Sequence, residues 1–329
     1  MLFRSLHLDT YGGNSGSPVF NAATHEVEGI LVRGETDFTS NGTCNVSLVC
    51  PTSGCRGEDV TRATEFAGLL SAFTLQTGTA LHETDHTFAF AVAPNDDLVA
   101  IKKSGTGTGS TEVHVLSAAS GYRAFSHQSG SALHETDGRF AFALGRNRDV
   151  YAFKKTNTGT GSTELHVLSA ASGYAQFSLQ TGTALHETDD TFELLVASNG
   201  DVFAIKKSNT GTHRTEVHVL SSASGYTQFS LQTGTALHET DATFAFALDA
   251  HRNLFAIKRS NCGTFSTEVH VLSATTNYQS FAVQTGTILH ETDHRFVFGL
   301  TAARRLMAIK KSSTGSHSTE VHVIDYPGA

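Results

Sequence analysis

The pentapeptide Leu-His-Glu-Thr-Asp occurs five times in this chain, and each copy stands 52 residues after the one before it. Two other strings keep the same phase: AIKK or a close variant begins at positions 100, 152, 204, 256 and 308, and TEVHVL or a close variant begins at 111, 163, 215, 267 and 319. Self-similarity at a fixed period indicates one supersecondary unit that is built repeatedly. We therefore expect five units of the same structure in residues 70–329.

Each repeat contains four candidate strands separated by polar turns. Residues 88–92 (FAFAV) alternate large and small side chains, which places Phe88, Phe90 and Val92 on one face of a strand. A turn that reads NDD, NRD, NGD, HRN or ARR in the five copies leads to a second alternating segment, DLVAIKK in the first copy. The segments TEVHVLS (111–117) and YRAFSHQ (122–128) follow. Four antiparallel strands per repeat are typical of a β-propeller blade.

The two ends of the repeat region predict how such a ring would close. The chain ends after TEVHVIDYPGA without a fourth strand, whereas the repeat region opens with an extra candidate strand at residues 73–76 (FTLQ). This first strand would complete the last blade and remove an open sheet edge. We expect an all-β fold, a closed five-bladed β-propeller with clasp closure; a trefoil and a linear array are the alternatives.

Each LHETD string is expected in a loop between strands, where it brings a histidine, a glutamate and an aspartate close together. The set could contact a ligand such as a sugar, or bind a metal ion. Short polar side chains in loops also commonly satisfy backbone groups in turns, and this structural role is the interpretation we favour, with no metal site predicted. The candidate ligand residues are His82, Glu83, Asp85, His134, Glu135, Asp137, His186, Glu187, Asp189, His238, Glu239, Asp241, His290, Glu291 and Asp293.

Other residues recur inside the repeats. A second histidine stands mid-strand at positions 114, 166, 218, 270 and 322, and we expect it to be packed or hydrogen-bonded between blades. Lys102 and Lys103 point to opposite faces of their strand, so at most one of them can pair with Glu112 on the neighbouring strand. A tyrosine at 122, 174, 226 and 278 could be a platform for stacking a sugar ring or a core residue.

Charge and hydropathy limit the possible partners. The 23 basic and 31 acidic side chains leave a formal net charge of -8, which gives no electrostatic footprint for nucleic acid or an anionic membrane. No stretch reaches the roughly 18 apolar residues of a membrane span. We expect a monomer with no nucleic-acid partner, no membrane insertion and no cofactor.

Residues 1–69 have a different character from the repeats. Residues 9–20 read DTYGGNSGSPVF, a glycine-rich loop around a serine, followed by an apolar segment. Glycines beside a serine let the backbone approach a substrate carbonyl and direct N–H groups at the oxygen where negative charge develops. The loop therefore has the outline of an oxyanion hole.

The string GNSGSPVF, the following GILVRG strand and the segment 57–70 resemble the C-terminal part of chymotrypsin-fold serine peptidases, specifically the bacterial trypsin-like and glutamyl-endopeptidase-like branch. The resemblance implies a partial trypsin-like β-barrel that ends in a helix over residues 57–70. It implies hydrolysis of peptide bonds through an acyl-enzyme. Leu31 stands where glutamyl-specific relatives have a histidine, which favours cleavage after Arg or Lys. The implied site residues are the nucleophile Ser15, the oxyanion-hole residue Gly13 and the specificity-pocket residues Asp9, Leu31 and Gly34.

The chain lacks the other partners of such a triad. In the family the histidine and aspartate come before the serine, and only fourteen residues precede Ser15. A serine without a general base is a weak nucleophile, so we expect the chain as given to be inactive. We expect the missing partners in sequence upstream of Met1.

The cysteines indicate the compartment. Cys44, Cys50 and Cys55 fall within twelve residues and are disulfide candidates, which are typical of an oxidising, extracellular environment, although residues 1–13 contain no signal-peptide core. The fourth, Cys262, stands alone in a Gly/Thr turn of one repeat.

Three functions remain open from the sequence. The chain could be the C-terminal portion of a secreted trypsin-like endopeptidase whose propeller binds a peptide or protein substrate or a surface. It could instead be a lectin-like propeller with a non-functional peptidase remnant, which binds a cell-surface glycan or polysaccharide; its blade number and repeat size are similar to animal lectins of the tachylectin-2 type. It could also be a complete but inactive peptidase homologue. We favour the first.

Overall fold

The computed structural model describes residues 2–5, 11–34, 36–48, 57–63 and 71–327, with the backbone alone for residues 2–5. The chain divides into two compact units, Met1–Leu70 and Ser71–Ala329. Nearly all of the regular structure in the described residues is β-strand, with four short 3₁₀ turns in the second unit.

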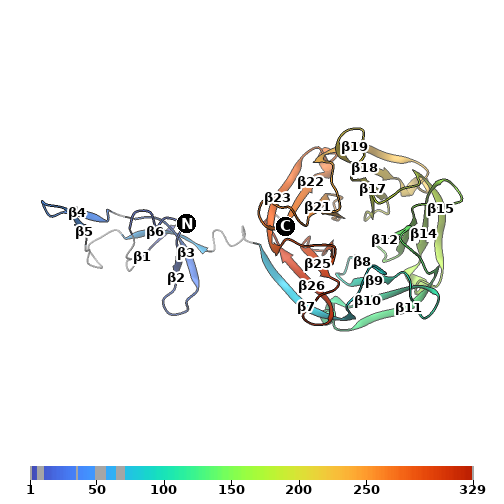
Figure 1. The fold of residues 1–329 in the computed structure, drawn as a ribbon, viewed down its shortest axis with the longest axis horizontal. Coiled ribbons are helices and arrows are strands. Elements are labelled where there is room, and N and C mark those ends of the chain that lie inside the picture. Colours follow the sequence, from blue (N-terminus) through green and yellow to red (C-terminus); the bar gives the residue numbers. More distant parts are fainter. Residues whose placement is uncertain (1, 6–10, 35, 49–56, 64–70, 328–329) are drawn as a thin grey trace. The chain divides into compact units, whose positions relative to one another are not determined.

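In the second unit, the described residues form five four-stranded antiparallel sheets, which we call blades 1 to 5 (Figure 1). Blade 1 contains β8 (Phe88–Val92), β9 (Leu98–Lys102), β10 (Ser110–Leu116) and β11 (Phe125–His134). Blade 2 contains β12 (Phe140–Leu144), β13 (Val150–Lys154), β14 (Ser162–Leu168) and β15 (Phe177–His186). Blade 3 contains β16 (Phe192–Val196), β17 (Val202–Lys206), β18 (Arg214–Leu220) and β19 (Phe229–His238).

The last two blades follow the same plan. Blade 4 contains β20 (Phe244–Leu248), β21 (Leu254–Lys258), β22 (Ser266–Leu272) and β23 (Phe281–His290). Blade 5 contains β24 (Phe296–Leu300), β25 (Leu306–Lys310), β26 (Ser318–Asp325) and β7 (Ala72–His82). The 3₁₀ turns before the outer strands are η2 (Ala118–Ser120), η3 (Ala170–Ser172), η4 (Ser222–Ser224) and η5 (Ala274–Thr276).

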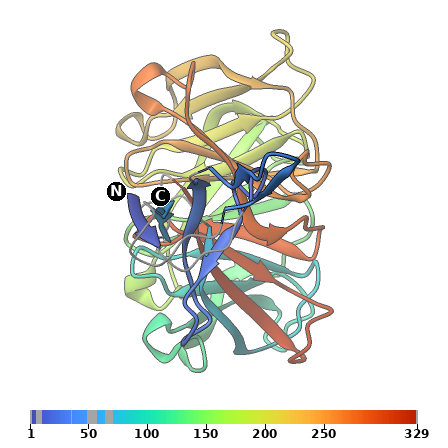
Figure 2. The ribbon, with the colours of Figure 1, turned by 90° about the vertical axis from the view of Figure 1, so that its left-hand side faces the viewer.

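The blades are arranged around a common centre. The first strand of each blade, β8, β12, β16, β20 or β24, contacts the first strand of the next blade, and β24 contacts β8. The fourth strands β7, β11, β15, β19 and β23 lie at the rim (Figure 1), and Figure 2 shows the same strands from the side. The expectation of a β-propeller is confirmed. Blade 5 is completed by β7 from the start of the region, with Leu75 opposite Val323 and Gln76 opposite His322.

The hydrophobic core consists of layers between neighbouring blades. Ile101 and Val113 of blade 1 pack with Val150 and Leu168 of blade 2, and equivalent layers lie between each later pair of blades, including blades 5 and 1. Both faces of each blade are therefore covered. This explains why the second strand reads as a continuous apolar run, since residues on both faces are removed from water.

The recurring tyrosines belong to this core. Tyr122 is 3% exposed, and its hydroxyl donates a hydrogen bond to the carbonyl oxygen of Asp96 at 3.0 Å. Tyr174, Tyr226 and Tyr278 make the same contact to the carbonyl oxygens of Arg148, Gly200 and Arg252. The sugar-stacking alternative for these tyrosines is wrong, because the rings are buried between blades. Burial raises the pKa of Tyr122 to about 12.

The first unit contains one four-stranded antiparallel sheet and one hairpin in its described residues. The sheet has the order β1 (Leu2–Ser5), β6 (Glu58–Arg62), β3 (Val27–Arg33) and β2 (Pro18–Phe20). The hairpin pairs β4 (Phe38–Ser40) with β5 (Asn45–Ser47). The buried hydrophobic cluster here consists of Val19, Leu31 and Val60.

The expected helix over residues 57–70 is not present in the first part of that range. Residues Glu58–Arg62 form β6, which pairs with β1 on one side and β3 on the other. Val60 is fully buried opposite Leu31, so the alternation of a β-branched residue with polar neighbours gives a strand with one apolar face. Residues 64–70 lie outside the described residues.

Candidate functional site

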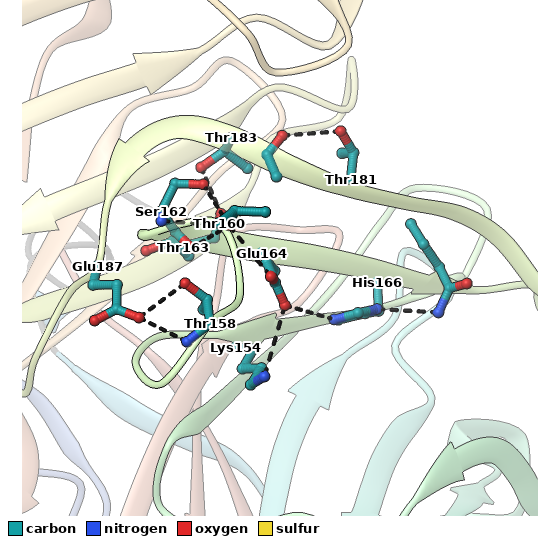
Figure 3. A network of polar contacts seen from close by, with 12 residues as sticks. Lys154, Thr158, Thr160, Ser162, Thr163, Glu164, His166, Thr181, Thr183 and Glu187 are labelled. Atoms are coloured by element: carbon teal, nitrogen blue, oxygen red, sulfur yellow. Dashed lines mark hydrogen bonds and ion pairs between the residues drawn. The ribbon is translucent and has the colours of Figure 1, made fainter.

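The glutamates of the LHETD strings bind loops of their own blades. The carboxylate of Glu187 accepts hydrogen bonds from the backbone N–H and the hydroxyl of Thr158, at 2.7 and 2.8 Å (Figure 3). Glu135, Glu239 and Glu83 hold Thr106, Thr210 and Thr314 in the same way. These hydrogen bonds lower the pKa of Glu187. The glutamates therefore fix the loop between the second and third strands.

The aspartates and histidines of the string have separate environments. Asp85 accepts hydrogen bonds from the N–H and hydroxyl of Thr87, and Asp137 binds the N–H and guanidinium of Arg139, so the aspartates cap the turn into the next blade. His82 and its four counterparts are exposed. Within the described residues, no group of three or more His, Cys, Asp or Glu side chains is arranged to hold a metal ion.

Cys262 occupies the threonine position of this clamp in blade 4. Its backbone N–H donates to the carboxylate of Glu291 at 2.5 Å, and its thiol lies 3.4 Å from the carbonyl oxygen of Lys258. Burial raises the pKa of the Cys262 thiol to about 11. The sequence did not reveal this contact because the glutamate and the cysteine are 29 residues apart.

In blade 2, the second histidine of the repeat lies in a row of polar side chains across the face of the blade (Figure 3). In blade 2, Gln180 donates from Nε2 to Nδ1 of His166 at 3.3 Å, and Nε2 of His166 lies 3.9 Å from the carboxylate of Glu164. Lys154, which pairs with Glu164 in the strand register, lies 3.8 Å from the same carboxylate. The histidine is hydrogen-bonded, but its partners lie in its own blade and not in a neighbouring one, so the expectation of a contact between blades is wrong. One lysine of the pair lies beside the glutamate in this blade, as expected.

The same row recurs in every blade. Glutamine-to-histidine distances are 3.2 to 3.4 Å, and histidine-to-glutamate distances are 3.4 to 3.9 Å. Two phenylalanines flank each histidine; in blade 2 the ring centroids of Phe140 and Phe177 lie 6.4 and 6.0 Å from that of His166. The five histidines of the rows are His114, His166, His218, His270 and His322.

Burial sets the protonation state of these histidines. It lowers the pKa of His166, while the negative charge of Glu164 opposes the shift. The other four row histidines have lowered pKa values for the same reason. When the neutral ring accepts at Nδ1 from the glutamine, its hydrogen is on Nε2, the atom that faces the glutamate.

A groove of about 410 Å³ opens over the row of blade 2. One wall is Ala132–Thr136, at the end of β11 of blade 1, and the other is the polar row with its two phenylalanines. The side chains of Lys154, Glu164 and His166 are 26%, 17% and 19% exposed, so they form part of the groove surface. Sequence reasoning named the row histidine and the lysine–glutamate pair separately, but it did not join them with Gln180 into one row, because the row residues come from three strands that only the sheet register brings together.

The serine loop of the first unit does not form a reaction centre in the described residues. Residues 11–18 are all exposed, and the hydroxyl of Ser15 donates a hydrogen bond to the carbonyl oxygen of Val32 at 3.0 Å. No hydrogen bond joins it to a histidine in the part of the chain that is described. An oxyanion hole stabilises charge because it excludes water, and this exposed loop does not.

The other site residues that the resemblance implies can be described by their backbone conformation and packing. Gly13 has a φ of +101°, and a Cβ at Gly34 would collide with the carboxylate of Glu58. Leu31 is buried in a small apolar cluster with Val19 and Val60. Asp9, Cys50 and Cys55 lie outside the described residues. Cys44 is exposed and forms no disulfide with a described cysteine.

The arrangement of the sheets defines the repeat region as a β-propeller. No family model matches the chain, and no curated protein matches it. Similar solved structures include a GH62 α-L-arabinofuranosidase catalytic domain from Coprinopsis cinerea, with 7% identity, a TM-score of 0.44 and coverage of 76% of this chain and 96% of that one. A gluconolactonase from Xanthomonas campestris gives 13% identity, a TM-score of 0.39 and coverage of 76% and 80%.

A third similar structure is described as the Dos1 propeller, with 11% identity, a TM-score of 0.34 and coverage of 70% of this chain and 57% of that one. The expectation of a trypsin-like serine endopeptidase is wrong: no family model of that kind matches the chain, and the exposed Ser15 hydroxyl donates to the carbonyl oxygen of Val32. A glycine-rich loop around a serine also serves as an ordinary turn, here between the backbone of Tyr11 and β2.

No helix in the described part of the chain is long and apolar enough to cross a membrane.

Proposed function

We propose that the repeat region is a five-bladed propeller that binds carbohydrate through equivalent grooves, one beside each polar row. The observation that carries this proposal is the recurrence of the row, with the same hydrogen-bond partners, in all five blades. A row needed only for packing would not require a lysine, a carboxylate and an amide at the surface of a groove. Such a set of a few placed polar groups beside apolar side chains is typical of a small-ligand site.

The chemistry of the row suits the hydroxyl groups of a saccharide. Lys154 offers N–H donors, Glu164 offers a carboxylate acceptor, and the side-chain carbonyl of Gln180 is available because its Nε2 is directed at His166. Phe140 and Phe177 offer apolar surface for the C–H groups of a sugar ring. The lysine and glutamate charges cancel within the row, which favours a neutral sugar.

The arrangement also suits multivalent binding, in which five individually weak sites act together. Five sites held at fixed spacing on one rigid body can engage a surface that displays many copies of a glycan. Simultaneous engagement raises the overall affinity without any new contact, by about 10² to 10⁴ in favourable geometry. We therefore propose a surface glycan or polysaccharide as the partner.

The test is a glycan array with neutral oligosaccharides, followed by isothermal titration calorimetry of the full chain with the best monovalent ligand. The expected stoichiometry is five. Lys154→Ala combined with Gln180→Ala should lower it to four without changing the affinity of the remaining sites. Arg146→Ala, an exposed change outside the groove, is the control. No binding to any glycan on the array, or a stoichiometry of one for the unaltered chain, would refute the proposal.

A further inference from the structure

A pocket of about 440 Å³ lies where the first strands of the five blades end. Every blade contributes the same positions to its lining, namely the last residue of the first strand and the two residues after it. Because these strands contact one another around the ring, the pocket lies at the centre of the propeller, and we call it the central pocket. It shares no residue with the groove over the row of blade 2.

The wall of the central pocket is aliphatic in every blade. It consists of the last residue of each first strand, and each of these side chains is half-buried: Val92, Leu144, Val196, Leu248 and Leu300. They pack against the hydrophobic layers between the blades, and part of each side chain lines the pocket. Such a wall favours the hydrocarbon part of a ligand, because binding removes apolar area from water.

The mouth of the central pocket has one charged side chain. The second residue after each first strand is exposed there, and these five residues are Pro94, Arg146, Ser198, Ala250 and Ala302. In the part of the chain that the structure describes, the guanidinium of Arg146 forms no ion pair and no hydrogen bond. An arginine fork without a protein partner is available to the planar acid group of a ligand.

The carboxylates in the turn of Arg146 have other partners. Asp97 of blade 1 lies 3.4 Å from Nη1 of Arg148, two residues after Arg146. Asp149 accepts a hydrogen bond from the backbone N–H of Ala170 at 2.8 Å. Among the described residues, neither carboxylate contacts Arg146, so the donors of its guanidinium stay available.

The carboxylate of the pocket lining is also engaged. The side chain of Asp249 is 1% exposed, it accepts two backbone N–H groups of its own turn, and it lies 3.1 Å from Nε of Arg304. Asp96 is not part of the lining, and its carboxylate accepts a hydrogen bond from the backbone N–H of Ala302 at 2.6 Å. The lining therefore combines an aliphatic wall with one available cation.

We propose that the central pocket binds one small carboxylate that carries an aliphatic chain. The acid group pairs with the guanidinium of Arg146 at the mouth, and the chain lies against the aliphatic wall. One available guanidinium matches one negative charge, which favours a monocarboxylate over a phosphate. The site does not depend on the saccharide grooves, because those recur in each blade whereas the central pocket is formed by all five blades together.

Calorimetry of the full chain with octanoate tests the proposal. We expect one saturable site per chain, with an affinity that rises about three- to fourfold for each methylene from hexanoate to octanoate. Acetate has the same charge without the chain, and octylammonium has the same chain with the opposite charge. Neither should show saturable binding.

Two arginine variants test the role of the charge. Arg146→Gln should weaken octanoate binding by about tenfold or more, because it removes a charged hydrogen-bond partner. Arg123→Gln removes the same charge from an exposed arginine that does not line the pocket, and it should leave the affinity unchanged. Equal weakening in the two variants would assign the effect to general charge attraction and overturn the proposal.

A third variant tests the position of the chain. Ala250 is exposed in a turn, so Ala250→Phe should leave the melting temperature nearly unchanged while its ring narrows the mouth and weakens octanoate binding. Ala124→Phe, at an exposed position outside the pocket, is the matched control. No saturable octanoate binding, equal binding of octylammonium, an affinity that does not change with chain length, or full affinity in Ala250→Phe would overturn the proposal.

Discussion

Glu83 and Thr314 are 231 residues apart in the chain, yet the carboxylate of Glu83 accepts hydrogen bonds from both the N–H and the hydroxyl of Thr314, at 2.6 and 2.8 Å. In the next three blades the equivalent pair is 29 residues apart and lies within one continuous repeat. The contact in blade 5 therefore joins the first strand of the ring to its last loop.

Glu83→Ala should lower the thermal unfolding midpoint, because the backbone N–H of buried Thr314 loses its acceptor at the point where the ring closes. Glu83→Gln retains an acceptor oxygen and should lose less. Differential scanning calorimetry of the three proteins checks the order. Equal midpoints for Glu83→Ala and the unaltered chain would contradict it.

Cys262→Thr should stabilise blade 4 by a few tenths to about 1 kcal/mol, because a hydroxyl would add the second hydrogen bond to Glu291 that the other blades possess. Urea unfolding measures the change, with Cys262→Ala as the matched control that lacks a hydroxyl. The raised thiol pKa of Cys262 also predicts slow alkylation at neutral pH compared with exposed Cys44. A gain in Cys262→Ala as large as in Cys262→Thr would contradict the hydrogen-bond explanation.

Tyr326→Phe should destabilise the propeller by about 1 kcal/mol, the usual net value of one hydrogen bond. Tyr326 is 3% exposed, and its hydroxyl donates to the carbonyl oxygen of Arg304 at 3.0 Å, as Tyr122 does to that of Asp96. Tyr122 and Tyr326 are equally buried and make equivalent hydrogen bonds, so we expect Tyr326→Phe and Tyr122→Phe to lower the free energy of unfolding by similar amounts. Chemical unfolding of both variants tests this. An unchanged free energy of unfolding in Tyr326→Phe would contradict a stabilising role for the Tyr326 hydrogen bond.

Stability should fall as the pH drops from about 6.5, the ordinary histidine pKa in an unfolded chain. Burial lowers the pKa of His114 and the four other row histidines, so below that pH the unfolded chain binds more protons than the folded one. The free energy of unfolding then increases with pH in this window and levels off above it.

Urea unfolding of the full chain at several pH values between about 5 and 8 measures this dependence, above the range where carboxylates titrate. A variant in which all five row histidines are replaced by glutamine should show a weaker dependence of the free energy of unfolding on pH. An unchanged profile would assign the pH dependence to other groups.

The repeat length, the four strands per repeat and the closing role of residues 73–76 were predictable from the sequence, because hydrophobic alternation and a constant period are local properties. The serine loop shows the limit of this reasoning. Its string resembled a peptidase motif, but whether Ser15 meets a base depends on contacts outside the string. In the structure, the hydroxyl of Ser15 donates a hydrogen bond to the carbonyl oxygen of Val32.

In the repeat region, the sequence by itself determined the strands, their order and the existence of a recurring histidine and lysine. Only the tertiary structure decided their partners. Gln180 contacts His166 through the sheet register, and Tyr122 is buried because another blade covers it. Periodicity along a chain specifies local conformation, whereas pairing, burial and charge depend on segments that become neighbours only when the ring closes.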